Sequence, residues 1–359
     1  MDRFLEALSV DDVLLEPRIS TIGSRDDINL SQDFRFDDGR DSVTYPLPIM
    51  SAPMDTVTGA LLARNLLYIG GAPVLPRFED VKQTLHKVRT ILDEIKEAGK
   101  CPIKARTRLW ASVGLIRTKD DMAAASQLVD AGLSICIDVA HGGNRAVVET
   151  AQTLQALGAT LIMAGNVATP DEASALVDVG VDVVRVGVGS GSCCTTRIKT
   201  GHGLPTFQSV YDISNHFDRS GRSAAIVADG GVKNSGDIVK LLGAGASVVM
   251  LGNLLAATED SAAPYADASY RWKKIRGMAS SEAKAAAGLD RERYVEGESG
   301  LVQCSGPLVL VLPKLMDGVR SGLAYSGAKD LSEFRAKARF RKITQNGLRE
   351  SGAHSINKG

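Results

Sequence analysis

The feature that most constrains the fold of this chain is a repeat of short apolar runs, each followed by a turn and an amphipathic stretch. Strands that read as near-continuous apolar runs and alternate with helices indicate a parallel sheet covered by helices. The runs lie at 47–53, 68–75, 109–115, 133–140, 160–167, 181–189, 224–231 and 246–253.

The stretches between these runs have helical periodicity. Leu85, Val88, Leu92 and Ile95 are spaced by three or four residues, which suits one buried helix face. Eight strand–helix units are the number that closes a barrel. We therefore predict an α/β fold, a single (β/α)8 barrel domain over residues 1–359 with N- and C-terminal extensions. A doubly wound open sheet is the competing fold, although no G-x-G-x-x-G opens the first strand–helix turn.

The composition excludes some partners and compartments. Lys plus Arg and Asp plus Glu both number 42, so no net charge favours nucleic acid or a membrane surface. No apolar run approaches the roughly 20 residues of a membrane span. The five cysteines lack metal spacing, which is typical of a reduced cytoplasmic protein.

A polar, glycine-containing stretch at 276–306 follows the last strand unit. Its position beyond the eighth strand predicts a flap over the active face. The tail, 331–359, begins as a basic helical segment and then loses its pattern.

The strongest local motif is the glycine-rich loop GVGSGSCCTTR (187–197), directly after the sixth strand. Glycines at alternate positions let the backbone approach a ligand closely, and consecutive amides form an anion site. Ser192 adds a hydroxyl donor. Cys194, at the mouth of such a site, is a candidate nucleophile. Packing is the expectation for the other cysteines, Cys101, Cys136, Cys193 and Cys304.

The next two strands end in Asp229-Gly230-Gly231 and Gly252-Asn253. Phosphate sites in barrels typically use these last strand loops. Asp229 suits either the two hydroxyls of a ribose or a helix N-cap. His141 lies on the same face without a partner in the sequence.

The loop GVGSGSCCTTRIKTG (187–201) is similar to the catalytic loop of the IMP dehydrogenase/GMP reductase family. The resemblance covers nearly the whole chain and implies a barrel fold and a homotetramer. Its further motifs are SVDDVLLEP (9–17), SAPMDTVTG (51–59), ICIDVAHG (135–142), IMAGNVAT (162–169), ADGG (228–231), VMLGN (249–253), RGMASS (276–281) and GVRSGLAYSGA (318–328).

At the matching positions, the resemblance implies that Cys194 bonds to C2 of a purine nucleoside monophosphate, while Thr196 and Glu296 move protons. Asp138 and Asn166 are expected where cofactor and base meet. The residues expected to bind substrate are Ser192, Gly231, Gly252 and Asn253 at the 5′-phosphate, Asp229 at the ribose, Gly277, Met278 and Arg293 at the base, and Gly297.

Two branches of the family remain to be separated. Residues 76–108 hold only one helix and a linker, so the dehydrogenase's usual regulatory insert is absent. Arg293-Tyr294 lies too close to Glu296 to be the dehydrogenase's water-activating dyad, and Arg293 better matches the reductase's base-binding arginine. SAPMDTVTG and NSGDIVK (234–240) resemble the dehydrogenase instead. The balance favours a reductase that converts GMP to IMP and ammonia with NADPH.

Several departures from the reductase pattern leave the substrate open. Ala279 and Val295 replace serines that contact guanine in the reductase, so a 7-deazaguanine-type nucleotide of nucleoside-antibiotic biosynthesis also fits. An IMP dehydrogenase without the insert and a non-catalytic nucleotide-binding regulator fit the same motifs. Arg77 is expected to meet the 2′-phosphate of NADPH, with NADH left open. The resemblance also allows a potassium ion on the backbone carbonyls of Gly189, Gly191 and Cys194.

Overall fold

The computed structural model describes residues 4–34 and 42–352, and its centre is an eight-stranded parallel sheet. The order of the strands is β4-β11-β10-β9-β8-β7-β6-β5, and a parallel bridge between Met50 and Ala72 joins the two edges. The sheet therefore closes into a barrel. The strands are β4 (Ile49–Ser51), β5 (Val74–Leu75), β6 (Trp110–Val113), β7 (Ser134–Asp138), β8 (Ile162–Val167), β9 (Val183–Val186), β10 (Ala225–Asp229) and β11 (Val248–Leu251).

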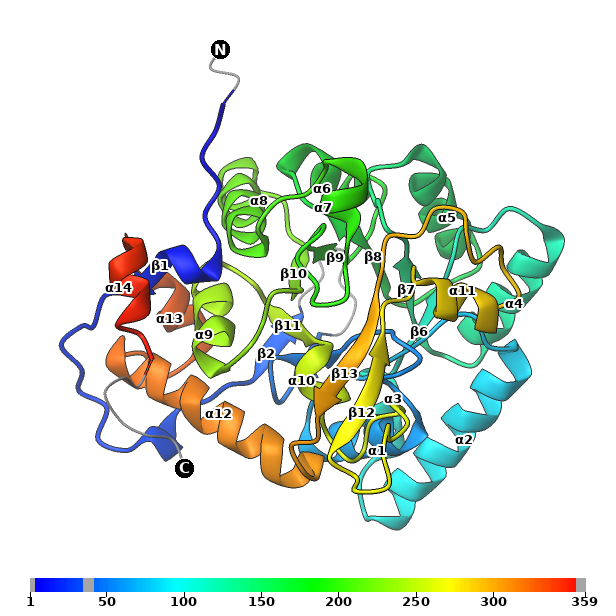
Figure 1. Cartoon of the computed structure of the whole chain (residues 1–359), viewed down its shortest axis with the longest axis horizontal. Coiled ribbons are helices and arrows are strands. Elements are labelled where there is room, and N and C mark those ends of the chain that lie inside the picture. The colour runs from blue at the N-terminus through cyan, green and yellow to red at the C-terminus, as the bar shows by residue number, and fades with distance from the viewer. Residues whose placement is uncertain (1–3, 35–41, 353–359) are drawn as a thin grey trace.

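Each of the eight predicted apolar runs contains one of these strands, so the predicted barrel is confirmed. Helices surround the strands (Figure 1). In α2, Val88, Leu92 and Ile95 are buried and Leu85 packs against the same core, as the spacing predicts. The surrounding helices are α1 (Ala60–Ile69), α2 (Val81–Glu97), α3 (Pro102–Arg106), α4 (Lys119–Asp130), α5 (Arg145–Ala156), α6 (Pro170–Val177), α8 (Thr206–Ser220), α9 (Ser235–Gly243) and α12 (Leu308–Tyr325).

Side chains fill the barrel interior. Trp110, Met163 and Met250 belong to one buried cluster inside the strands. At the amino-terminal end, Phe34 and Tyr45 pack with ring centroids 4.3 Å apart, and the indole of Trp110 donates to the hydroxyl of Tyr45. Phe34 and Tyr45 come from the hairpin of β2 (Gln32–Phe34) and β3 (Val43–Tyr45), which closes this end. A ligand therefore has access from the carboxyl ends of the strands.

The flap is a hairpin of two antiparallel strands, β12 (Trp272–Arg276) and β13 (Ser299–Gln303), drawn in yellow and orange in Figure 1. Short helix α11 (Ser281–Ala286) lies between them. The hairpin starts at Trp272, slightly before the predicted start at 276. Two further short helices, α7 (Thr196–Thr200) and α10 (Asn253–Ala256), follow β9 and β11 at the active face.

The two extensions pair with each other. Strand β1 (Val13–Leu15) is antiparallel to β14 (Phe340–Lys342), a contact that the sequence patterns did not indicate. The short helical turns Val10–Asp12 and Arg25–Asp27 flank β1, and α13 (Leu331–Lys337) and α14 (Gln345–Arg349) flank β14. Within the described residues, no helix has the length and apolar character needed to cross a membrane.

Candidate active site

The carboxyl ends of the strands open into a cavity of about 790 Å³. This volume lies within the range of small-ligand pockets. The predicted site residues that line it are Arg77, Asp138, Asn166, Gly189, Gly191, Ser192, Cys194, Thr196, Asp229, Gly231, Gly252, Asn253, Gly277, Met278, Glu296 and Gly297. Residues from widely separated segments are thus gathered around one space, as the barrel topology requires.

The glycine-rich loop is held against the neighbouring strand end. Gly187 has a φ of +148°, and a Cβ atom there would lie 1.9 Å from the carbonyl oxygen of Asp229. Gly230 has a φ of +96°, and its added Cβ would lie 3.0 Å from the amide nitrogen of Gly191. Only glycine permits both approaches. The two loops therefore form one continuous wall of main chain, which suits an anion.

Cys194, Thr196 and Glu296 form a chain of hydrogen bonds. The thiol of Cys194 donates to Oγ1 of Thr196 across 3.2 Å, and this hydroxyl donates to Oε2 of Glu296 across 2.8 Å. All three side chains are half-buried at the cavity wall. A nucleophilic sulfur is thus connected to a carboxylate through one hydroxyl, an arrangement that can move a proton beside a covalent intermediate.

Main-chain hydrogen bonds fix the flap against the cysteine loop. The amide of Thr195 donates to the carbonyl of Glu296 across 2.9 Å, and the amide of Glu298 donates to the carbonyl of Cys193 across 2.8 Å. Gly297, between them, is buried. A Cβ there would lie 3.0 Å from the amide nitrogen of Ser280, so the residue must be small.

An ion pair holds the first flap strand on the loop after β4. Nη2 of Arg276 lies 2.5 Å from Oδ2 of Asp55. Hydrogen bonding to Asp55 raises the pKa of Arg276, and the pair is partly shielded from solvent. The amide of Asp55 also donates to the sulfur of Met278 across 3.4 Å. These contacts position the base-binding segment predicted at Gly277 and Met278.

Arg185 is a site residue that the sequence patterns missed. Its buried guanidinium pairs with both Asp138 and Asp229. Burial lowers the pKa of Arg185, but the two carboxylates outweigh this effect and raise it. The available signal was a lone arginine inside the apolar run VDVVRVGVG (181–189), because unpaired charges are rarely fully buried.

On the side of Asp138, Arg77 and Phe78 extend the cavity wall. Nε of Arg77 lies 3.4 Å from Oδ2 of Asp138, and its guanidinium carbon lies 4.2 Å from the ring centroid of Phe78. Within the described residues, this contact with Asp138 is an ion pair without hydrogen-bond geometry. An exposed aromatic ring beside a guanidinium fits a planar, polar cofactor.

Arg293 is the predicted site residue that does not line the cavity. Its side chain is exposed and donates to the hydroxyl of Tyr294 across 3.3 Å, whereas Tyr294 does line the cavity. His141 also lies outside the lining residues. It gains a partner from another strand unit, because its Nε2 lies 2.9 Å from Oε1 of Glu172.

The remaining cysteines differ in environment. Burial raises the pKa of Cys136 to about 12 and also raises the pKa of Cys193, which agrees with the packing roles expected for them. Cys101 is exposed, so the expectation that it packs in the interior was wrong. Within the described ranges, no three His, Cys, Asp or Glu side chains are arranged to hold a metal ion.

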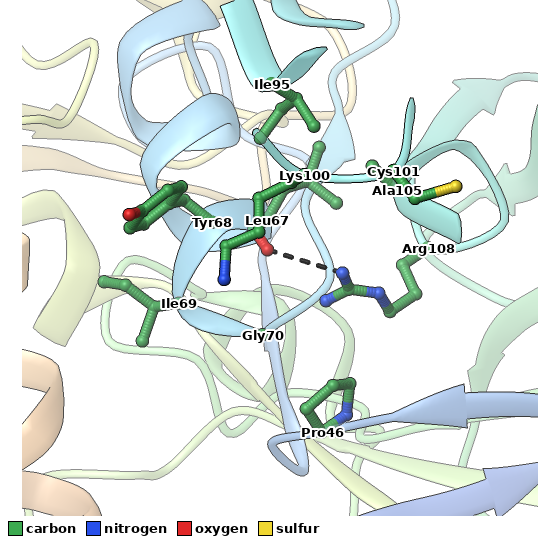
Figure 2. A pocket seen from close by; sticks show the side chains of 10 residues that line it. All are labelled: Pro46, Leu67, Tyr68, Ile69, Gly70, Ile95, Lys100, Cys101, Ala105 and Arg108. Carbon is green, nitrogen blue, oxygen red and sulfur yellow. Dashed lines mark hydrogen bonds between the residues drawn. The ribbon is translucent and has the colours of Figure 1, made fainter. Parts of the chain in front are cut away.

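A second, smaller hollow of about 220 Å³ lies at the amino-terminal end of the barrel (Figure 2). It is bounded by the ends of α1 and α2 and by α3. Arg108 donates hydrogen bonds to the carbonyls of Leu67 and Gly71 there, so its guanidinium is already bound to the main chain of the protein. This hollow is separated from the strand ends that carry the chemistry.

Comparison with known proteins independently supports the family resemblance seen in the sequence motifs. Residues 7–354 match the family model described as the IMP dehydrogenase / GMP reductase domain. The GMP reductase of Leishmania major is 34% identical over 333 residues, which cover 88% of this chain and 67% of that protein. The inosine-5′-monophosphate dehydrogenase of Bacillus subtilis is 41% identical over 266 residues, 71% of this chain. The aligned residues span about half of that dehydrogenase, 53%.

A solved structure is similar over the whole fold. A cysteine-to-alanine variant of GMP reductase from Trypanosoma brucei, in complex with guanosine 5′-monophosphate, superposes with a TM-score of 0.86. The two chains are 27% identical, and the match covers 99% of each. The barrel, the flap and the extensions therefore recur together in a protein with a bound purine nucleotide.

Proposed function

The chain belongs to the IMP dehydrogenase/GMP reductase family of oxidoreductases, and we propose that it reduces GMP to IMP and ammonia with NADPH. The observation that carries this proposal is the hydrogen-bonded chain from Cys194 through Thr196 to Glu296. A regulator that only binds nucleotide has no need of this series of hydrogen bonds. The similarity to GMP reductases over most of the chain supports the same reaction.

In the proposed complex, the nucleotide lies along the main-chain wall. The amides and hydroxyl of Ser192, Gly231, Gly252 and Asn253 hold the 5′-phosphate, because consecutive amides attract an anion. The ribose hydroxyls donate to Asp229. The base lies against Gly277, Met278 and Gly297, with Arg293 as a further base contact once the flap segment moves inward.

The first half of the reaction is a covalent exchange at C2. The thiol proton of Cys194 passes through the hydroxyl of Thr196 to Glu296 while the sulfur bonds to C2 and electron density shifts onto a ring nitrogen. Glu296, acting through the hydroxyl of Thr196, delivers the proton that the 2-amino group needs to leave as ammonia. Breakage of the C2–N bond leaves a thioimidate between Cys194 and C2. Two smaller barriers thus replace one large barrier.

The second half requires a hydride at C2, which the nicotinamide cofactor supplies when it is bound. Asp138 and Asn166 would orient this group beside the base, and Arg77 would meet the 2′-phosphate of NADPH. The place of Arg77 in the cavity lining and the exposed ring of Phe78 support that assignment. The C2–S bond then breaks, and the sulfur of Cys194 leaves as a thiolate.

We further propose that the protein binds a potassium ion, assembles as a homotetramer and works in the cytoplasm. The ion would bind the carbonyls of Gly189, Gly191 and Cys194, although the Gly191 carbonyl also accepts from the amide of Cys194 across 3.0 Å. All five cysteines are free thiols, which suits a reducing compartment.

The test measures absorbance of the reduced cofactor with purified protein. With GMP and NADPH, the absorbance falls, and NADH in place of NADPH gives the cofactor preference. With IMP and oxidised cofactor, a faster gain would instead identify an IMP dehydrogenase. Cys194→Ala should bind GMP without multiple turnover, and sustained deamination by this variant would contradict the covalent route.

One residue of the cavity wall favours a nucleotide with a modified base as a second candidate substrate. Ala279 lines the cavity and offers no side-chain hydrogen bond at a position where the reductase resemblance implies serine. A 7-deazaguanine-type nucleotide would undergo the same chemistry at C2. Faster cofactor oxidation with 2-amino-7-deazapurine nucleotides than with GMP would favour this substrate class, and silence with every nucleotide would favour a regulator.

A further inference from the structure

Arg185 is a cation buried in the middle of an apolar strand. Its side chain is 8% exposed, while Val184 and Val186 beside it are fully buried. A buried ion is costly unless it is paired, and an apolar residue of similar size usually packs as well or better. A buried arginine in β9 therefore calls for an explanation other than stability.

The guanidinium joins two strand ends that are not neighbours. Its Nη1 lies 2.5 Å from Oδ1 of Asp138, at the end of β7. Its Nε and Nη2 both lie 2.9 Å from Oδ2 of Asp229, at the end of β10. The two carboxylates line the cavity on the sides expected to hold the cofactor and the ribose.

The intervening strand β8 is built to let this side chain pass. Gly165 of β8 pairs directly with Arg185 of β9. A Cβ on Gly165 would lie 2.7 Å from the Cβ of Arg185, so any larger residue would collide with it. The next residue, Asn166, donates from Nδ2 to the same Oδ2 of Asp229 across 2.8 Å.

These contacts divide the two oxygens of Asp229. Oδ2 accepts from Arg185 and Asn166, whereas within residues 4–34 and 42–352 Oδ1 accepts no hydrogen bond from the protein. Oδ1 is therefore the oxygen available to a ligand. A carboxylate fixed through one oxygen presents the other in a single orientation, which favours a ribose diol over a sugar that lacks hydroxyls.

We propose that Arg185 is a positioning residue that orients Asp229 toward the ribose and Asp138 toward the cofactor. The inference rests on the proposed function, because it takes the ligand to be a purine ribonucleotide. Arg185 acts through the two aspartates, so its effect must disappear when its partner is removed.

The experiment measures dissociation constants of GMP and 2′,3′-dideoxy-GMP by calorimetry. We expect the wild type to prefer GMP by about tenfold or more, since a hydrogen bond to a charged group contributes about that factor. Arg185→Gln and Asp229→Asn should each reduce this preference to near unity. The double variant should show no further loss, whereas a merely structural arginine would weaken both ligands equally and add to Asp229→Asn.

Two further variants keep the result interpretable. Arg185→Lys retains a buried cation but cannot bond both aspartates, so it should fold and still lose most of the preference. Arg222 forms a two-point ion pair with Asp178 away from the cavity, and Arg222→Gln should keep the wild-type preference.

The two ways in which the experiment can fail are distinguishable. A wild type that prefers GMP, together with Arg185→Lys and Arg185→Gln variants that prefer it equally, would overturn the role of Arg185 alone. A wild type that binds neither nucleotide would overturn the proposed function as well.

Discussion

The hydroxyl of Thr196 donates a 2.8 Å hydrogen bond to Oε2 of Glu296, although the two residues are 100 positions apart in the chain. Because a glutamine side chain cannot exchange this proton, Glu296→Gln should lower kcat by about 10²- to 10⁴-fold. Binding of GMP should change little. Steady-state kinetics and calorimetry on the same preparation measure both quantities.

Glu298→Gln is the matched control for that variant, since Glu298 is exposed and does not line the cavity. Its kcat should stay close to that of the wild type. Equal losses in the two variants would show that Glu296 acts through general flap structure rather than through its proton.

The main-chain wall should tolerate no side chain at Gly230. Its φ is +96°, and an added Cβ would lie 2.8 Å from Oγ of Ser190 and 3.0 Å from the amide nitrogen of Gly191. Gly99 also has a positive φ, +73°, but no atom lies within 4 Å of its added Cβ. Gly99→Ala should lose about 1 kcal/mol of unfolding free energy through its positive φ alone, and Gly230→Ala should lose more because its Cβ also collides with the neighbouring loop.

Only Gly230→Ala should also weaken nucleotide binding, by about tenfold or more, because it displaces the amides of the glycine-rich loop. Thermal melts and GMP titrations of the two variants test this difference. If Gly230→Ala bound GMP with unchanged affinity, the proposal that the 5′-phosphate binds this main-chain wall would be wrong.

Cysteine alkylation should depend on pH differently at different thiols, because the thiolate is the reactive form. A hydrogen bond from the backbone of Lys104 lowers the pKa of Cys101 below its ordinary value of 9.0, and burial raises the pKa of Cys193 above it. The alkylation rate of Cys101 should therefore reach half of its maximum below pH 9. The rate at Cys193 should still rise above pH 9, and Cys136, with a pKa of about 12, should stay unmodified.

Mass spectrometry after timed iodoacetamide treatment resolves these thiols individually. Bound GMP should protect Cys194 and leave the rate at Cys101 unchanged. Protection of Cys101 by GMP, at the opposite end of the barrel, would contradict the location of the site.

The ion pair between Arg276 and Asp55 should matter for turnover more than for stability. Arg276→Met releases the first flap strand from the loop after β4, so kcat/KM for GMP should fall about tenfold. The free energy of unfolding should change by about 1 kcal/mol or less, as for other partly exposed pairs. Arg145→Met, which breaks an exposed pair with Glu149 on α5, is the control and should leave both quantities unchanged.

The sequence was sufficient to predict the barrel because each strand is a compact apolar run with small or polar residues at its carboxyl end. It also predicted Cys194, Thr196 and Glu296 as site residues, since the cysteine loop and the flap carry distinctive local motifs, and the structure places these three side chains beside one another. Cys194 lies after β9 at the face where all barrel strands end, and main-chain hydrogen bonds between the flap and the cysteine loop bring Glu296 to it.

Arg185 could not be assigned in the same way. Its two partners lie 47 and 44 positions away along the chain, and no periodicity links a charged residue in a strand to such partners. The pairing of β1 with β14 was missed for a related reason, because three-residue strands give almost no pattern. Arg293 carried a plausible motif position, but its side chain packs on Tyr294 at the surface.

Because Glu296 lies on the hairpin and not on the barrel, the residues expected to bind the phosphate and ribose are separate from the residue expected to transfer the proton. The glycine-rich wall and Asp229 belong to the barrel, and we expect them to provide the phosphate and ribose contacts, whereas the carboxylate lies on a separate segment that is joined to the cysteine loop by main-chain hydrogen bonds. We therefore expect replacements on the outer surface of the hairpin, at Trp272 or Leu301, to change the turnover rate more than the affinity. Substitutions that change the turnover rate can therefore accumulate on the outer surface of this hairpin, away from the expected phosphate and ribose contacts.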